Sequence, residues 1–458
     1  MIGSTPDSYS SFAGLLCGFN FGTIDNCHVS GKIHSDIAGG ICGINFGIIK
    51  NSFSAAVING RISGGICGQN SEQYNNDTYI GIITNCHTDS FSVDGYQAGG
   101  GICGYNLSGQ IINCDAVIDY ISGGGHSSSY SSPGYGVGGL CGYNDGQIIS
   151  CNAKATVSGG EYAGGLCGWH AGGSIINSYT NSNTSSNLSA GGLCGIILYE
   201  NSESGFPSLF QCYASGTVTG GQYAGGLCGV GGNGTISQCY ATGTVLGEEY
   251  VGGLCGINDA SIDNSYAIAN LGENGNNNYN CQIGGLCGYY RGGPVSDCYS
   301  ACTFTPGVNT TFYGFLDNNS FPIPGCFYDK DLAGFEVHIG GFGITTALMQ
   351  DRTTYSKTYF PGEPHEFEVN WDFTDTDGDP AIWRMREGVD DYPKLAWQFP
   401  ATDISGDIDV NLKDFSILSN CWLTAIGEPG FDQTTDINND EIIDLIDMSM
   451  ILNDWLSQ

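Results

Sequence analysis

A short string, Tyr162-Ala163-Gly164-Gly165-Leu166-Cys167-Gly168, recurs through most of this 458-residue chain. Its core, Gly-Gly-(Leu/Ile)-Cys-Gly, appears nine times, and Gly14–Gly18 is a looser tenth copy. The core cysteines are Cys17, Cys42, Cys67, Cys103, Cys141, Cys167, Cys194, Cys228, Cys255 and Cys287. Successive core cysteines lie 25 to 38 residues apart. The basic unit is therefore about 25 residues long, and some copies carry insertions.

The segments between these strings alternate Ile, Val, Thr and Tyr between Gly and Asn, as in Ile236–Cys239 and Tyr240–Val245. β-Branched and aromatic residues bounded by turn residues are typical of short strands. Such short pieces cannot fold singly, but stacked repeats bury one another's apolar faces. We therefore predict an all-β fold, a parallel β-solenoid of about ten coils, over residues 1–328.

Most of the remaining cysteines follow an Ile-x-polar piece, where Ser takes the same place in three copies. These are Cys27, Cys86, Cys114, Cys151, Cys212, Cys239 and Cys298. Equivalent Cβ atoms on stacked strands lie ~4.8 Å apart, beyond the usual disulfide range of ~3.5–4.5 Å. We predict buried free thiols, in preference to a disulfide ladder or a metal array.

Two rows of asparagine accompany the repeat. The first follows the core glycine: Asn20, Asn45, Asn70, Asn106, Asn144 and Asn258. The second precedes the Cys/Ser position: Asn26, Asn51, Asn85, Asn113, Asn177 and Asn264. Stacked side-chain amides can form hydrogen bonds along the axis of the rod-shaped solenoid, and Asn tolerates left-handed turns. We therefore predict a structural role for both rows. A glycan-binding row is the alternative.

Charge excludes several partners. Twelve Lys+Arg against 46 Asp+Glu leave a net charge of −34, which argues against nucleic-acid binding. No apolar run approaches the ~18 residues of a membrane-spanning helix. The first residues lack both a basic and an apolar stretch, so we interpret the chain as N-terminally incomplete.

After the repeats, residues 329–399 are predicted to form a segment that closes the solenoid. Trp371, Trp383 and Trp397 make it rich in aromatic residues, and an exposed strand edge needs a cover. Thr345 is expected to cap a short helix over residues 346–349.

Two acidic loops lie in the last segment, residues 400–458. Residues 403–414 and 436–447 are 33 residues apart and place oxygen ligands at the spacing of a twelve-residue calcium loop. The predicted ligands are Asp403, Ser405, Asp407, Asp409, Asn411 and Asp414, then Asp436, Asn438, Asp440, Ile442, Asp444 and Asp447. Asp409 and Ile442 would offer backbone carbonyls. An apolar helix is expected after each loop, so we predict two Ca²⁺ sites in a small α-helical module.

The repeat resembles the GLUG-motif family of bacterial surface proteins, over roughly residues 13–330. Cys239-Tyr240-Ala241-Thr242-Gly243 and Cys212-Tyr213-Ala214-Ser215-Gly216 carry the likeness. Such repeats occur in adhesin-like proteins, so the resemblance implies an extracellular or cell-surface scaffold.

The two loops resemble a type I dockerin, an EF-hand-like module that docks carbohydrate-active proteins onto cohesin partners. The resemblance implies cohesin contacts at Leu412, Lys413, Leu445 and Ile446, and a polysaccharide-related context. Two features depart from the family. Position 6 is Ile408 and Glu441 in place of glycine, and neither helix carries the Ser-Thr pair of many cohesin binders.

No catalytic constellation emerges, so we favour a non-catalytic scaffold over an enzyme. Tyrosines at strand edges could meet glycans: Tyr96, Tyr135, Tyr162, Tyr223 and Tyr250. The alternative is a polysaccharide lyase or glycoside hydrolase that uses the solenoid face. Its candidate acids are Asp115, Asp119, Asp259, Asp263 and Asp297.

Overall fold

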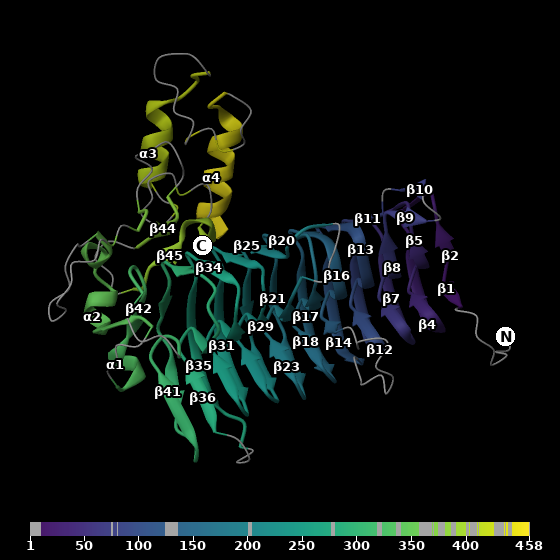
Figure 1. The fold of residues 1–458 in the computed structure, drawn as a ribbon. Coiled ribbons are helices and arrows are strands. Elements are labelled where there is room, and N and C mark those ends of the chain that lie inside the picture. The colour runs from purple at the N-terminus through teal and green to yellow at the C-terminus, as the bar shows by residue number, and fades with distance from the viewer. Residues whose placement is uncertain are drawn as a thin grey trace. The chain divides into compact units, whose positions relative to one another are not determined.

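Figure 1 presents a computed structural model of the chain. It describes residues 11–74, 77–79, 81–123, 136–199, 204–275, 280–317, 323–335, 340–356, 369, 371–373, 381–385, 391–399, 403, 410, 412–425, 435, 437 and 442–457. The chain divides into two compact units, Met1–Ile344 and Thr345–Gln458.

Within the described residues, the first unit contains two long parallel sheets. The first sheet has 23 strands: β1 (Phe12–Gly14), β4 (His28–Gly39), β7 (Phe53–Gly64), β12 (His87–Gly100), β14 (Asp115–Gly123), β15 (Val137–Gly138), β17 (Asn152–Gly159), β18 (Tyr162–Gly164), β21 (Tyr179–Asn181), β22 (Asn183–Ser186), β23 (Ser189–Gly191), β26 (Tyr213–Ser215), β27 (Thr217–Gly220), β28 (Tyr223–Gly225), β31 (Tyr240–Gly247), β32 (Tyr250–Gly252), β35 (Tyr266–Glu273), β36 (Cys281–Gly284), β39 (Tyr299–Ser300), β40 (Thr303–Thr305), β41 (Thr310–Tyr313), β42 (Phe327–Asp329) and β43 (Phe342–Ile344).

The second sheet has 18 strands in the same described part: β2 (Cys17–Asn20), β3 (Thr23–Asp25), β5 (Cys42–Asn45), β6 (Ile48–Lys50), β8 (Cys67–Ser71), β11 (Ile82–Thr84), β13 (Cys103–Ile112), β16 (Cys141–Ile149), β19 (Cys167–His170), β20 (Ser174–Ile176), β24 (Cys194–Ile197), β25 (Ser208–Phe210), β29 (Cys228–Gly231), β30 (Thr235–Ser237), β33 (Cys255–Asn258), β34 (Ser261–Asp263), β37 (Cys287–Tyr290) and β38 (Val295–Ser296). Antiparallel pairs join β9 (Gln73–Tyr74) to β10 (Asp77–Thr78) and β44 (Trp383–Arg384) to β45 (Lys394–Leu395). The helices are α1 (Lys330–Ala333), α2 (Thr346–Met349), η1 (Arg352–Ser356), η2 (Ala396–Gln398), α3 (Leu412–Asn420) and α4 (Leu445–Ser457).

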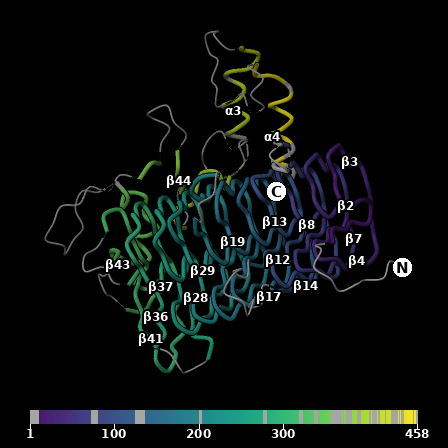
Figure 2. Tube along the Cα trace, turned by 45° about the vertical axis from the view of Figure 1, so that its right-hand side comes forward, coloured from purple at the N-terminus to yellow at the C-terminus, as the bar shows by residue number. Residues whose placement is uncertain are grey.

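The chain passes from the first sheet to the second at each Gly-Gly-(Leu/Ile)-Cys-Gly string, so one repeat makes one coil of the stack (Figure 2). The ten core cysteines pair in register with those of the next coil. Leu193 shows the pattern: its N–H donates to the Leu227 carbonyl (2.8 Å), and its carbonyl accepts from the Leu166 N–H (2.9 Å). The predicted all-β, solenoid-like fold is confirmed.

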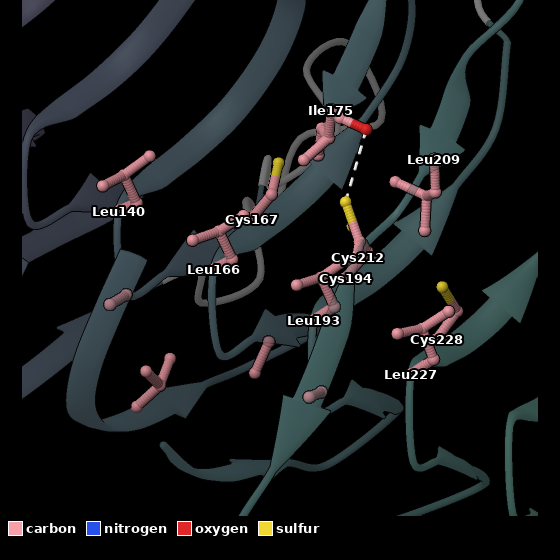
Figure 3. Packing of buried hydrophobic residues seen from close by; sticks show 14 of the residues in the cluster. Leu140, Leu166, Cys167, Ile175, Leu193, Cys194, Leu209, Cys212, Leu227 and Cys228 are labelled. Atoms are coloured by element: carbon pink, nitrogen blue, oxygen red, sulfur yellow. Dashed lines mark hydrogen bonds between the residues drawn. The ribbon is translucent and has the colours of Figure 1, made fainter. Parts of the chain in front are cut away.

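The bend at this string needs glycine because the backbones lie too close for a side chain. A Cβ atom on Gly191 would collide with the Cys194 carbonyl oxygen. After this bend, Leu193 and Cys194 point into the main core, beside the equivalent residues of neighbouring coils (Figure 3).

All 21 cysteines are free thiols, and only Cys17 and Cys27 are partly exposed. Many thiols donate to a carbonyl oxygen, as Cys212 does to that of Ile175 (3.4 Å; Figure 3). The prediction of buried free thiols is confirmed.

The first row of asparagines forms a buried ladder. Each side-chain amide donates to the carbonyl oxygen of the next side chain, from Asn20 through Asn106 to Asn144, at 2.7–2.8 Å. On the next coil His170 takes the ladder position, and its Nδ1 lies 3.1 Å from Asn144 Nδ2. The second row occupies left-handed corners, with φ of 51° at Asn51 and 45° at Asn264. The ladder is confirmed from Asn20 to Asn144, whereas the Asn258 amide donates to the Ala260 carbonyl oxygen at 2.9 Å. The left-handed corners are confirmed for the second row.

A second apolar region lies on the other side of the bend. Consecutive strand residues point to opposite faces, so Ala163 enters the main core whereas Tyr162 faces away. We call this region the aromatic seam. Its members are Phe12, Ile37, Ile44, Phe46, Ile62, Tyr79, Tyr105, Leu107, Tyr143, Tyr162, Trp169, Ala171, Ile196 and Val230. This region was not predicted from the sequence.

The second unit begins with the predicted helix α2, where the Thr345 hydroxyl accepts from the Leu348 N–H at 3.4 Å. An aromatic stack follows: the rings of Tyr355 and Trp371 lie 4.4 Å apart, and those of Trp371 and Trp383 lie 4.5 Å apart. Helices α3 and α4 form where helices were predicted, after the two acidic segments.

Candidate functional site

The C-terminal segment preserves its sequence duplication in three dimensions. Residues 33 positions apart are buried at equivalent places: Val410 with Ile443, Asp414 with Asp447, and Leu418 with Ile451. The apolar residues of these pairs belong to one cluster, against which Phe415 also packs. The Phe415 and Trp455 rings meet edge to face at 5.6 Å, which joins α3 to α4.

Asp447 closes the second loop. Its Oδ1 accepts from the Ile437 N–H (2.7 Å), and its Oδ2 accepts from the Asp444 N–H (2.8 Å). Asp444 Oδ1 in turn accepts from the Ile446 N–H (2.7 Å) at the start of α4. These bonds bring loop positions 2, 9 and 12 together. Ile442, whose backbone carbonyl is a predicted ligand, forms an antiparallel β-bridge with Ala425.

Asp403, at position 1 of the first loop, is also buried. Its Oδ2 lies 3.0 Å from Nη1 of Arg384, a residue of strand β44. The guanidinium neutralises a carboxylate that has no exposed side-chain surface. Arg384 was not predicted as part of the site, because it lies in another segment of the chain.

The structure thus places Asp403, Asp414, Ile442, Asp444 and Asp447 among the predicted ligands. The other predicted ligands lie outside the described residues: Ser405, Asp407, Asp409, Asn411, Asp436, Asn438 and Asp440. Within the described part of the chain, no three His, Cys, Asp or Glu side chains converge closely enough to hold a metal ion.

The predicted partner contacts lie at the starts of the two helices. Leu412 and Lys413 open α3, whereas Leu445 and Ile446 open α4. Ile446 is 51% exposed. The side chains of Leu412, Lys413 and Leu445 lie outside the described residues.

Three of the five tyrosines proposed for glycan contact share one register column. Tyr162 pairs with Ser189, Ser189 with Tyr223, and Tyr223 with Tyr250. The Tyr223 and Tyr250 rings lie 6.0 Å apart, and the Tyr162 ring lies 5.5 Å from Trp169. Tyr96 is highly exposed. Tyr135 lies outside the described residues.

A second tyrosine column was not predicted. Tyr179, Tyr213, Tyr240, Tyr266 and Tyr299 stack with ring centroids 4.8–4.9 Å apart and rings within 5° of parallel. Tyr179 is 40% exposed, whereas Tyr299 is fully buried. Burial raises the pKa of the Tyr213 hydroxyl to about 12. Each of these tyrosines directly follows the Cys/Ser position of its repeat. This repeated placement could have predicted the column from the sequence.

The candidate acids of the enzyme hypothesis occupy different environments. Asp115 pairs with Nδ1 of His87 at 2.8 Å, and Asp259 lies 3.7 Å from Arg291. Asp119 is exposed. Burial, together with the negative charge of Asp263, raises the pKa of Asp297 to about 6. Asp263 itself accepts from the Ser237 hydroxyl (2.7 Å). Within this set of acids, Asp297 and Asp263 are therefore the two that interact electrostatically.

The GLUG motif family matches residues 133–158, 220–246 and 247–271. The second match runs from β28 into β31 and the third from β32 into β35, so each spans about one coil of the stack. The chain therefore carries GLUG repeats in this part of the solenoid-like unit. No curated protein and no solved structure matches the chain. Among the described residues, no helix combines the length and apolar character needed to cross a membrane.

Proposed function

We propose that this protein is an extracellular or cell-surface repeat scaffold, adhesin-like, with a calcium-dependent docking module at its C-terminal end. The single observation that carries the proposal is the pair of buried carboxylates Asp414 and Asp447 at equivalent places of a 33-residue duplication. Carboxylates are rarely fully buried unless a cation or hydrogen-bond donors compensate them.

The donor set fits calcium. Ca²⁺ takes six to eight oxygen ligands, and the two loops offer carboxylates, amide oxygens and a hydroxyl at calcium-loop spacing. Residues 403–458 hold 12 Asp+Glu and one Lys. These carboxylates repel one another, and bound calcium would reduce the repulsion and order each loop. Asp447 would hold the end of the second loop in place through its bonds to the Ile437 and Asp444 N–H groups.

The partner proposed for this module is a cohesin-like protein, in a polysaccharide-related setting. The exposed Ile446 at the start of α4 supports a protein contact there, because a few side chains buried at the centre of an interface carry most of its affinity. The GLUG repeats support the scaffold role, since stacked coils hold the two ends of the first unit at a fixed separation.

Calcium titration of the full chain by calorimetry tests the proposal. We expect two sites per chain, and we expect Asp414→Asn and Asp447→Asn each to remove one of them. Asp119→Asn, an exposed acid in the repeats, is the matched control and is expected to retain both. Absence of calcium binding in the wild-type chain would reject the docking module.

Partner docking has its own test. Ile446→Asp is expected to weaken calcium-dependent binding to an immobilised cohesin by at least tenfold, about 1.4 kcal/mol, while calcium affinity stays unchanged. No calcium-dependent cohesin binding by the wild-type chain would remove the dockerin-type reading and leave the calcium sites standing.

A second candidate function is a polysaccharide-cleaving enzyme, favoured by the raised pKa of Asp297 beside Asp263. A carboxyl group with a raised pKa can serve as a general acid beside a second carboxylate. Release of reducing sugar or unsaturated uronate from polysaccharides, lost in Asp297→Asn and kept in Asp119→Asn, would support it. No turnover by the wild-type chain would exclude it for the substrates assayed.

A further inference from the structure

The first described coil carries two partly exposed cysteines, and they differ in what lies beside them. Cys17 is in register with Cys42 of the next coil, and Cys42 is in register with Cys67. Cys27 has Ser52 in the next coil, and the Ser52 hydroxyl oxygen accepts from the Cys27 N–H at 3.1 Å. One accessible thiol therefore has a thiol beside it, whereas the other has a hydroxyl.

The sulfur atoms of the Cys17 column interact from coil to coil. The thiols of Cys17 and Cys67 each hydrogen-bond to the Cys42 sulfur. One coil farther along, the sulfur atoms of Cys67 and Cys103 lie 3.7 Å apart. Cys42 belongs to the main apolar core, and Cys17 packs against that core. Two sulfur ligands in apolar surroundings suit a soft cation better than a hard one.

The spacing of the pair also suits a bridging ion. Stacked strands ~4.8 Å apart hold their Cβ atoms too far apart for a disulfide. If a metal–thiolate bond is about 2.3 Å long, as for zinc, an ion in line between two thiolates holds the sulfurs about 4.6 Å apart. Two thiols in contact then have to separate by only about 1 Å, which rotation of the partly exposed Cys17 side chain allows.

We propose that Cys17 and Cys42 form a two-coordinate site for a soft monovalent cation such as Cu(I). Thiolate sulfur selects such ions, whereas Ca²⁺ takes oxygen ligands. Binding replaces two S–H protons with one metal ion: two metal–sulfur bonds form, two protons pass to the solvent, and no atom changes its oxidation state. The site lies in the first unit and does not depend on the proposed calcium module.

Exposure confines the site to this end of the column. Two thiolates and one monovalent cation leave one negative charge, which is costly to bury in an apolar core. Water at Cys17 stabilises that charge and gives the ion a way in. Cys67 and the cysteines that follow it in the column are fully buried. The sulfurs lie in a row, so only neighbours can share an ion, in keeping with the absence of three converging ligands among the described residues.

Cu(I) titration of the reduced full chain tests the site. The titration is done without oxygen and in competition with a chromogenic Cu(I) chelator. We expect a single tight site in the wild-type chain, and we expect Cys17→Ser to weaken it roughly a hundredfold or more because one of the two thiolates is lost. Since Cys17 is partly exposed, this variant should keep the circular dichroism spectrum of the wild type.

Cys27→Ser is the matched control. It removes a partly exposed thiol from the same coil, but one whose neighbour in the next coil is Ser52. We therefore expect it to bind Cu(I) as the wild type does. Equal affinities in the wild type, Cys17→Ser and Cys27→Ser would show adventitious copper only and would overturn the inference.

A gain of binding makes the second test. Ser52→Cys places a thiol beside Cys27, and the column accepts cysteine, since the Cys86 thiol of the following coil donates to the Thr84 carbonyl (3.3 Å) as the Ser52 hydroxyl does to that of Lys50 (2.7 Å). We expect a second Cu(I) site in Ser52→Cys, and we expect Cys27→Ser to remove it from that chain. A stoichiometry that stays at one ion would contradict the inference.

Calcium separates this site from the proposed docking module. Excess Ca²⁺ should leave Cu(I) binding unchanged, because the two ions use different ligands in different units. A chain that binds Cu(I) as expected but no calcium would reject the proposed function and leave this inference standing. Displacement of Cu(I) by Ca²⁺ would place the copper on carboxylates and overturn the inference.

Discussion

At the scale of single residues, the asparagine ladder shows how one substitution changes the chemistry of a repeated position. Asn144 Nδ2 lies 3.1 Å from His170 Nδ1, and His170 Nε2 lies 3.2 Å from the Ser208 carbonyl oxygen. A neutral imidazole satisfies both contacts, accepting at Nδ1 and donating at Nε2. Protonation would place a donor at Nδ1 against the amide donor of Asn144.

His170 therefore makes the rod sensitive to acid. Burial lowers its pKa in the folded chain below the ordinary value of 6.5. The unfolded chain takes up this proton at higher pH, so the stabilisation is complete above about pH 6.5 and is lost as pH falls. We expect His170→Asn to reduce this loss by up to roughly 1.4 kcal/mol per pH unit below 6.5.

Thermal melting followed by circular dichroism between pH 5 and pH 8 measures the effect. The difference between wild type and His170→Asn cancels the contribution of the other histidines. An equal loss of melting temperature in both chains at pH 5 would show that His170 is not the titrating group.

Cysteine reactivity can also be predicted residue by residue. Only Cys17 and Cys27 are partly exposed, and burial raises the pKa of Cys302 to about 12. Because the reagent has to reach the sulfur atom, we expect an aromatic disulfide reagent to label about two thiols in the native chain and all 21 after denaturation. Rapid labelling that persists in a Cys17→Ser/Cys27→Ser chain would contradict this.

At the scale of the element, the glycine bend determines where one sheet ends and the next begins. The recurring string predicted the coils because each of its ten copies forms the same structural unit, which packs against its neighbours in the same way. Insertions did not disturb the prediction, since the register of the core cysteines continues across them. Residues 313–316 do not carry the string, yet they continue the stack. Tyr313 pairs with Gly284, and Leu316 bridges to Cys287.

We expect Gly191→Ala to destabilise the rod by about 3 kcal/mol or more, because the new Cβ meets the Cys194 carbonyl, a backbone atom that cannot move aside. Gly22→Ala is the control, since a Cβ there meets nothing within 4 Å, and a change below about 1 kcal/mol is expected. Denaturant melts of the two variants make the comparison. Equal stability would mean that the bend can relax.

The aromatic seam and Arg384 were harder to predict, for a shared reason. Tyr162 and Trp169 meet across the bend, and Arg384 meets Asp403 from another segment. Local periodicity specifies which face of a strand is apolar, but it does not specify which distant element covers it. The helices after the acidic loops were predictable because their apolar spacing is local.

At the scale of the whole molecule, the chain combines two units that depend on different forces. The first unit gains from coil-to-coil packing, whereas the second, in our proposal, gains from calcium. We expect calorimetric scans to show two transitions and a chelator to lower only the one that belongs to the second unit. A shift of both transitions, or of neither, would contradict the proposed division.

Register between neighbouring coils has an evolutionary consequence. Every coil presents the same hydrogen-bonding edge to the next, as in the run of paired cysteines from Cys17 to Cys287. A gene segment that encodes one whole repeat can therefore be copied or excised without disturbing the interfaces that remain. Lineages can lengthen or shorten such a spacer in steps of one coil, about 4.8 Å each, and keep the C-terminal module unaltered.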